Sequence, residues 1–242
     1  QNEFPGISLW LDAADSATIT TGSGSDVSSW SNKIDQNVKM WAWSTGTPNT
    51  GGSMNGVNAI TFDDNERLYA RKNSTNGTNG TTWNPLGTDG AASGTYQDFC
   101  IILAFQFNNL MNCNNPWNIG WGGHMPYGSH SKIYWDYPNH GNNRVHISVA
   151  QSTPYVLTFY GSTTESKRLY SLNGTEVIGN GPSQDSVSGQ FFLPFSRTDQ
   201  RATFAEMMVI KGTMSDSARH RAEGYLSHKW GIPLTGSHTW AG

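Results

Sequence analysis

Short apolar segments bounded by glycine, asparagine, serine or proline recur along almost the whole chain, and they constrain its fold more than any other feature. Several of these segments alternate apolar with polar residues, as half-buried strands do. We predict strands at residues 7–11, 59–62, 67–70, 99–107, 119–122, 133–137, 144–149, 155–160, 167–172, 191–195 and 202–210. Strands that follow one another without helices predict an all-β fold, an antiparallel two-sheet jelly-roll sandwich.

Residues 99–107 have the pattern of a strand from the centre of a sheet. Phe99 and the other odd-numbered residues share one face, while Cys100 and the even-numbered residues after it make the other face nearly apolar. A strand that is apolar on both faces is covered on both sides. Further along, Asn173 and Gly174 tolerate positive φ and predict a type I′ hairpin turn.

One amphipathic helix is predicted near the C-terminus, at residues 215–229. Ser215 is a good N-cap, and Gly231 supplies the left-handed position that ends many helices. The spacing of apolar residues between them places Tyr225 and Leu226 on the inward face. A single helix after many strands is expected to pack across one end or face of the sandwich.

The composition excludes several classes of protein. Charged residues make up only 14% of the chain, yet ten Trp, nine Tyr and ten Phe are enough to build a core, so the chain is not disordered. The net charge of −3 and the absence of a basic run argue against nucleic acid and against an anionic membrane surface. The longest apolar stretch, residues 99–105, is far shorter than the ~20 residues of a membrane helix.

The whole sequence, residues 1–242, is expected to form one domain, because no break in composition marks a second. The first residue is Gln1 rather than Met, which suggests a processed chain or the ordered part of a longer polypeptide. Two cysteines, Cys100 and Cys113, are too few for a disulfide scaffold, and their spacing favours free thiols.

Three stretches of the sequence point to one family. They cover residues 9–15 with 27–33 and 55–63, then 133–136 with 143–145 and 169–174, and finally 204–210 with 215–231. In order and spacing they resemble the concanavalin A-like jelly rolls related to laminin G domains, which recur in bacterial surface proteins and phage virion proteins. The resemblance implies a jelly roll that finishes with an edge strand and a closing helix. Its motifs explain packing, and they carry no chemistry.

The carboxylates argue against catalysis. Glycoside hydrolases of this fold carry Glu-x-Asp-x-x-Glu on one strand, because acid and nucleophile must lie about 5 Å apart. No two glutamates here share a strand at that spacing; they are Glu3, Glu66, Glu165, Glu176, Glu206 and Glu223. Glu206 stands between apolar positions, so it either points to solvent or accepts hydrogen bonds. No other catalytic motif is present, and we predict that the protein is not an enzyme.

A metal site has one candidate. Asp63, Asp64 and Glu66 follow the predicted strand 59–62, where aspartates favour a turn. The alternative is a calcium site at Asp63 and Asp64, since calcium takes hard oxygen ligands in loops. No other cofactor is expected, because no metal-ligand spacing relates His124, His130, His140 and His146.

Aromatic and histidine side chains gather among Asn, Gly and Pro in residues 112–143. Rings that stack on a sugar beside polar groups that bind its hydroxyls are typical of carbohydrate sites. We therefore name as candidate glycan contacts Trp117, His124, Tyr127, Tyr137 and His140. The alternative is that these rings close the core or the rim of the sandwich. Trp121 and Trp135 lie in strand-like segments and are expected to be buried.

A second aromatic patch is predicted at Trp41 and Trp43. The two rings share a face if the segment is extended, and aromatic residues are enriched at protein interfaces. We take this patch as the candidate contact with a partner, either another surface protein or a second copy of the chain.

These observations leave three functions open. The first is a structural or adhesion protein of a virion surface, a phage capsid decoration or tail-fibre module, that also binds glycans. The second is a secreted or cell-surface bacterial carbohydrate-binding module, and the third, a glycoside hydrolase, is disfavoured by the carboxylates. The first two place the protein on a virion surface or outside the cell. The resemblance to phage virion proteins favours the first.

Overall fold

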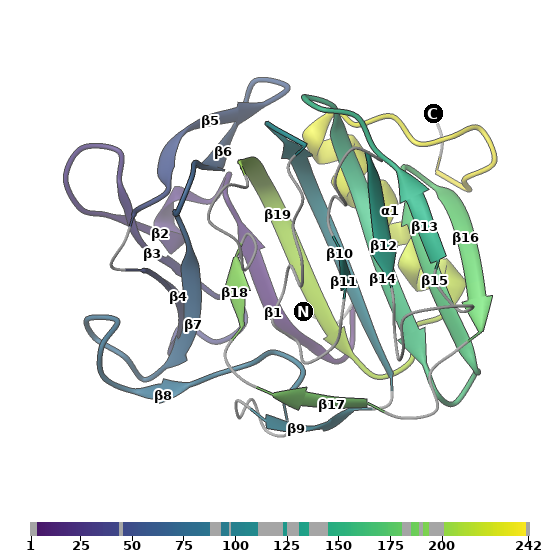
Figure 1. The fold of residues 1–242 in the computed structure, drawn as a ribbon, viewed down its shortest axis with the longest axis horizontal. Coiled ribbons are helices and arrows are strands. Elements are labelled where there is room, and N and C mark those ends of the chain that lie inside the picture. The colour runs from purple at the N-terminus through teal and green to yellow at the C-terminus, as the bar shows by residue number, and fades with distance from the viewer. Residues whose placement is uncertain are drawn as a thin grey trace.

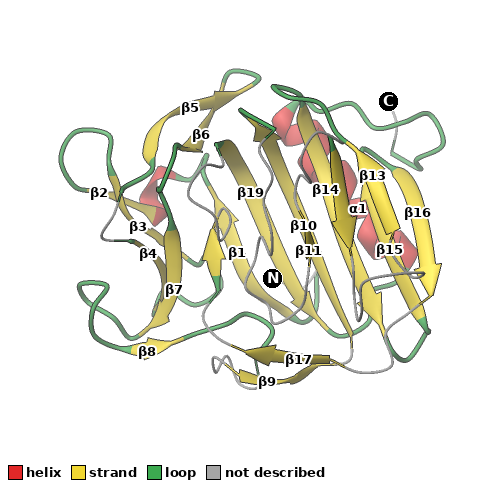
Figure 2. Cartoon of the chain, viewed as in Figure 1, coloured by secondary structure: helices red, strands yellow, loops and turns green. Residues whose placement is uncertain are grey.

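The computed structural model describes residues 4–43, 46–87, 93–96, 98–110, 123–124, 131–135, 145–180, 185–188, 191–193 and 201–240. These residues form two large antiparallel sheets, two smaller ones and a single α-helix (Figures 1 and 2). The prediction of an all-β sandwich with one C-terminal helix is confirmed. In this described part of the chain, no helix is long and apolar enough to span a membrane.

The first large sheet has eight strands. Its order is β16 (Thr175–Asn180), β15 (Lys167–Leu172), β14 (Pro154–Ser162), β10 (Asp98–Phe107), β19 (Ala202–Lys211), β6 (Val57–Phe62) and β5 (Asn49–Met54), with β1 (Ile7–Asp12) also paired to β19.

The second large sheet has six strands. Its order is β18 (Phe192–Leu193), β7 (Leu68–Lys72), β4 (Val38–Ala42), β3 (Val27–Ser31) and β2 (Ile19–Thr21), with β8 (Thr81–Thr82) also paired to β7. The smaller sheets join β11 (Gly123–His124), β12 (Lys132–Trp135) and β13 (Val145–Ser148), and β9 (Ser93–Tyr96) with β17 (Asp185–Ser188). A 3-10 turn, η1 (Ser16–Thr18), precedes β2.

Within the described residues, the predicted strands are confirmed with small differences at their ends; residues 119–122, 136–137, 144 and 194–195 lie outside the described residues. The sequence did not predict the strands β2, β3, β4, β5, β8, β9, β11, β16 and β17. Two of these are β5 and β16. They are the two edge strands of the first sheet, where each strand pairs with only one neighbour and carries more polar residues. Such edge strands lack the apolar alternation on which the prediction depends.

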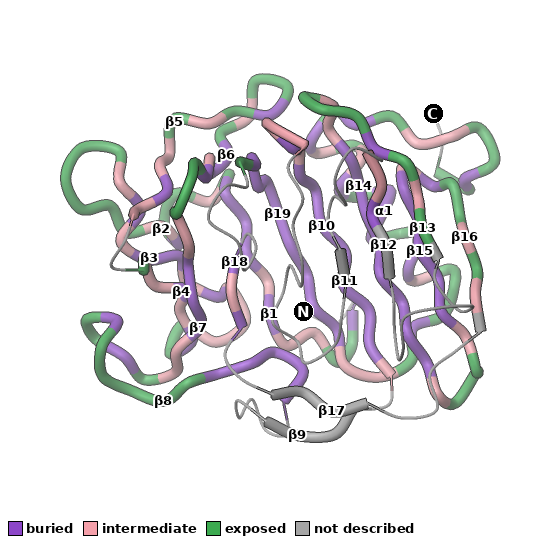
Figure 3. Tube along the Cα trace, viewed as in Figure 1, coloured by how far each residue is buried: buried purple, intermediate pink, exposed green. Residues whose placement is uncertain are grey.

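The centre of the first sheet is β10, paired with β14 on one side and β19 on the other. Residues 99–105 are all buried, and Figure 3 shows the same for most of β14 and β19. The helix α1 (Asp216–Trp230) packs against β10 and β14, and β13 packs against β15 and β16. In Figure 1 the helix crosses behind these strands while β12 and β13 lie in front. The prediction of a strand covered on both faces is confirmed.

Two local predictions are also confirmed. Asn173 (φ 49°) and Gly174 (φ 82°) join β15 to β16 in the expected hairpin turn. Cys100 is a buried free thiol whose pKa is raised by burial, and Cys113 lies outside the described residues.

The helix begins and ends where the sequence predicts. Ser215 caps its first turn with a side-chain oxygen, and Gly231 ends it in the left-handed conformation at φ 61°. From the turn between β5 and β6, the Asn55 side chain donates to the backbone oxygens of Trp230 at 2.8 Å and Gly231 at 3.0 Å. These bonds attach the C-terminal end of the helix to the first sheet.

The inward face of the helix was predicted correctly for Leu226 and wrongly for Tyr225. Leu226 is fully buried, but Tyr225 is 37% exposed. Adjacent residues of a helix point about 100° apart, and the inward apolar residues Ala222, Leu226 and Trp230 follow one another at intervals of four. Tyr225 therefore lies at the border between the helix and the solvent.

Candidate functional site

The N-terminal segment, the outer side of α1 and the C-terminal tail enclose a cleft of about 500 Å³. Two of the large exposed aromatic side chains, Tyr225 and Trp240, line this cleft at 37% and 55% exposure. The complete lining is Phe4, Arg221, Gly224, Tyr225, His228, Lys229 and Trp240. We call this the helix cleft.

Gly224 has no side chain, which leaves room for Trp240 to lie directly against the helix. A β-carbon at Gly224 would lie 2.8 Å from both Cβ and Cγ of Trp240, closer than real atoms approach. The backbone N–H of Trp240 also donates to Nδ1 of His238 at 3.1 Å. The indole is thus anchored along one side while more than half of the residue stays exposed.

Tyr225 is fixed at its hydroxyl end. The hydroxyl donates to Oε1 of Glu206 at 3.0 Å, and the ring meets Trp10 edge to face at a centroid distance of 6.4 Å. Burial, together with the negative charge of Glu206, raises the pKa of Tyr225 to about 12. The hydroxyl therefore stays protonated, and the ring presents a fixed surface to the cleft.

Glu206 joins β19 to the helix beneath the cleft. Its fully buried carboxylate accepts hydrogen bonds from the indole nitrogens of Trp10 (2.7 Å) and Trp230 (2.9 Å), and from Lys229 Nζ (2.6 Å) as well as Tyr225. Of the two alternatives for Glu206, the buried acceptor is the one observed. Its role is to hold the elements that carry the cleft.

Lys229 bridges the buried carboxylates of Asp12 (2.7 Å) and Glu206, and lies 5.5 Å from the centroid of the Tyr225 ring. Burial opposes its charge, but the hydrogen bonds to Asp12 and Glu206 raise the pKa of Lys229. At the rim, Arg221 and His228 are exposed. Aromatic surface beside cationic and imidazole donors can hold a ligand that has both an apolar face and polar groups.

Most of the predicted glycan contacts lie outside the described residues: Trp117, Tyr127, Tyr137 and His140, together with Trp121. His124 belongs to β11, where its backbone pairs with Tyr134, and Trp135 belongs to β12, paired with Val145. The side chains of these strand residues are not among the described ones. The glycan contacts in residues 112–143 and the burial of Trp135 therefore stay predictions.

The predicted partner patch is only partly open. Trp43 is 37% exposed, and its ring meets those of Tyr69 and Phe192 at centroid distances of 5.2 and 5.7 Å. Trp41 is half-buried, because Gly77 of the 73–80 loop lies against it. Contact with a partner at these residues stays a prediction.

At the predicted calcium site, Asp64 is engaged by an arginine. Arg201 donates from Nε to Oδ1 at 3.1 Å and from Nη2 to Oδ2 at 2.8 Å, and these hydrogen bonds lower the pKa of Asp64. The backbone N–H of Asp63 donates to Glu66 at 2.6 Å, as expected for a turn. Calcium at Asp63 and Asp64 would compete with Arg201, and this site stays a prediction.

Sequence reasoning missed the helix cleft. Phe4, Gly224 and Trp240 are far apart along the chain, and only the fold brings them together. One local signal was present: Gly224 stands inside a helix, where glycine costs about 1 kcal/mol relative to alanine and indicates a close approach of another group.

No protein-family model matches the sequence, and no curated protein is similar to it in sequence. Solved structures do share the fold. The chain is similar to the receptor-binding domain of botulinum neurotoxin D, with a TM-score of 0.57 and 8% identity over 90% of this chain and 52% of that one. It is also similar to the binding domain of Paraclostridial Mosquitocidal Protein 1, with a TM-score of 0.59 and 9% identity over 97% of this chain and 56% of that one.

A third similar structure is Trypanosoma rangeli sialidase in complex with sialic acid, with a TM-score of 0.54 and 12% identity over 93% of this chain and 33% of that one. The chain thus spans about half the length of the toxin binding domains and a third of the sialidase. At these identities the likeness is one of fold, an antiparallel β-sandwich shared with binding domains of two toxins and with a sialidase.

Proposed function

We propose that this chain is a non-catalytic carbohydrate-binding module and that the helix cleft binds a sugar. The observation that carries the proposal is the presence of two exposed aromatic rings, Tyr225 and Trp240, in one cleft with exposed polar side chains. Both rings are anchored, so little conformational entropy is lost when a ligand binds.

The chemistry of the cleft suits a sugar ring. The C–H face of a pyranose packs on aromatic carbon, while its hydroxyls need hydrogen-bond partners at the edge. Arg221 and His228 supply these partners at the rim. The volume of about 500 Å³ lies within the range of small-ligand sites, about 300–1,000 Å³.

The comparisons support carbohydrate binding in a general way. One structure of the same fold was solved with sialic acid, and two others are binding domains of toxins. Fold alone does not carry function from one protein to another. The proposal therefore depends on the cleft.

A binding rather than catalytic role is supported by the state of the carboxylates near the helix. Glu206 and Glu223 are fully buried and engaged by hydrogen-bond donors, so neither meets a substrate in solvent. The setting we propose is a virion surface, where the sandwich serves as a structural and adhesive module, and the alternative is a bacterial cell-surface module. The sequence resemblance supports the virion setting, and co-purification with particles at a fixed copy number tests it.

The binding site is tested on an array of oligosaccharides that includes glycans ending in N-acetylneuraminic acid. Trp240→Ala is expected to abolish the binding of the wild-type protein, while Trp43→Ala, an exposed tryptophan outside the cleft, retains it. If Trp117→Ala or Tyr137→Ala abolishes binding and Trp240→Ala does not, the site lies in residues 112–143 instead. If the wild-type protein binds no glycan, the proposed function is wrong.

A further inference from the structure

Two histidines and a glutamate converge where α1 meets the C-terminal tail. His220 and Glu223 are one helical turn apart, and His238 reaches them from the tail. One ligand atom from each of the three side chains lies within 4.8 Å of the others, and in the described residues no other such group of His, Cys, Asp and Glu occurs. The imidazole centroids of His220 and His238 are 4.6 Å apart.

The three side chains differ in accessibility. Glu223 is fully buried and His238 is nearly so, whereas the His220 side chain is 23% exposed. A cavity of about 290 Å³ adjoins them, lined by Gly174, Glu176, His220, Ser237 and His238. Solvent and ions can therefore approach from the side of His220.

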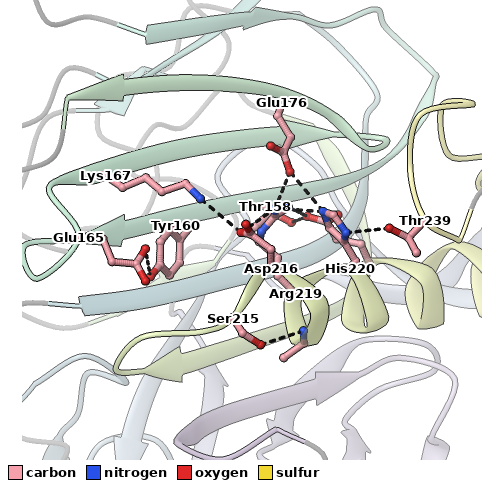
Figure 4. A network of polar contacts seen from close by, with 12 residues as sticks. Thr158, Tyr160, Glu165, Lys167, Glu176, Ser215, Asp216, Arg219, His220 and Thr239 are labelled. Carbon is pink, nitrogen blue, oxygen red and sulfur yellow. Dashed lines mark hydrogen bonds and ion pairs between the residues drawn. The ribbon is translucent and has the colours of Figure 1, made fainter.

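The surrounding charges can accept a cation. Arg219 contacts three carboxylates, those of Glu223 at 3.1 Å, Asp216 at 3.2 Å and Glu176, and Lys167 lies 3.3 Å from Asp216 (Figure 4). Three negative charges thus face two positive ones. A divalent ion would change the net charge of the cluster from −1 to +1, a far smaller change than creating a buried charge in an apolar site.

We propose that His220, Glu223 and His238 form a binding site for a divalent transition metal ion, with zinc as the best fit. Two imidazoles and one carboxylate are ligands that zinc takes, and three protein ligands leave a fourth position for water. Oε1 of Glu176 lies 3.3 Å from Nε2 of His220, and Nη2 of Arg219 lies 3.1 Å from the same nitrogen, so a metal there replaces the contact with Arg219. Zinc is bound at about 2.0–2.2 Å, so its tetrahedral ligand atoms lie roughly 3.4 Å apart. Nε2 of His238 and Oε2 of Glu223, which are 2.8 Å apart, must therefore separate to admit the ion.

Binding displaces a proton. Because Nδ1 of His238 accepts the Trp240 N–H, its Nε2 carries the proton that is donated to Glu223 at 2.8 Å. A metal at Nε2 takes the place of this proton, which moves to Nδ1 of the same ring and ends its hydrogen bond with the Trp240 N–H. The metal would also fasten the tail that carries Trp240 to the helix. This inference goes beyond carbohydrate binding and stands without it.

The test is zinc titration of the full chain by calorimetry, together with melting in zinc and in chelator. We expect one equivalent of zinc to bind and the melting temperature to rise, because an ion that binds only the folded state stabilises it. His220→Ala, at a partly exposed position, should fold and lose at least about tenfold in zinc affinity. The matched control is His146→Ala, which removes an exposed imidazole of β13 and leaves the affinity unchanged.

Two results would overturn the proposal: no change in melting temperature at excess zinc, or unchanged zinc affinity in His220→Ala. Glycan binding is measured separately on the metal-free protein, so failure of the zinc site and failure of the helix cleft are distinguishable.

Discussion

Gly224 and Trp240 are in direct contact, and a β-carbon at position 224 would lie 2.8 Å from two atoms of the tryptophan. The helix therefore carries a glycine in its interior at a point where the C-terminal tail lies directly against it. Glycine there costs about 1 kcal/mol of helix stability relative to alanine. In return, Gly224 allows the indole of Trp240 to lie on the helix at the border of the helix cleft.

Gly224→Ala should weaken glycan binding and leave the stability of the fold nearly unchanged. The new methyl group displaces Trp240, so glycan binding falls, while the gain in helix propensity offsets the lost contact and keeps the free energy of unfolding within about 1 kcal/mol of wild type. Calorimetry and urea denaturation measure the two effects. Full binding by this variant would show that the position of Trp240 does not matter.

Glu206→Gln should destabilise the fold strongly. The amide nitrogen of glutamine is a hydrogen-bond donor, and it would face two other donors, Lys229 Nζ and Trp230 Nε1. The ammonium group of Lys229 would also lose one of the two buried carboxylates that it bridges. Removing one partner of a buried ion pair costs about 3–5 kcal/mol, to be measured by urea denaturation. Glu165→Gln, which alters an exposed acceptor of the Tyr160 hydroxyl, is the control and should cost about 1 kcal/mol or less. Equal effects of the two variants would mean that the Glu206 network does not stabilise the fold.

The fold should lose stability in acid through Asp12. Burial alone would raise the pKa of Asp12, but hydrogen bonds from Lys229 and Lys33 lower it. A carboxyl whose pKa is lower in the folded state stabilises the fold above its unfolded pKa, about 3.9 for aspartate, and this contribution disappears as the pH falls through the folded pKa. The melting temperature should therefore fall below about pH 4.

Asp12→Asn tests this assignment. The variant should melt lower than wild type at neutral pH and lose less stability in acid. The rest of the acid decline is due to Glu176 and Asp216. Partial desolvation opposes the charge of both carboxylates, but hydrogen bonds from Arg219 lower their pKa values. An acid decline as steep as that of wild type would show that Asp12 is not responsible.

The sequence predicted what depends on neighbouring residues. The two apolar faces of residues 99–107 correctly predicted a central strand, and Ser215 and Gly231 correctly predicted the ends of the helix. Both signals are local, because strand alternation and helix caps depend only on residues that are close in the sequence. Tyr225 was misplaced because the pattern could not show that polar Arg219 and Glu223 also face inward, bound to each other and to the sheet. The helix cleft and the histidine cluster depend on where the tail from residue 232 to 240 lies, which only the folded chain decides.

The most direct measurement is calorimetric titration of wild-type protein and Trp240→Ala with the strongest glycan from the array, alongside melting curves for both. The account predicts saturable binding by wild type and a loss of at least about tenfold in the variant, which is about 1.4 kcal/mol and a reasonable value for one lost stacking ring. The melting temperatures should agree closely, since Trp240 is 55% exposed. Equal affinity of the two proteins would contradict the assignment of the helix cleft as the carbohydrate site.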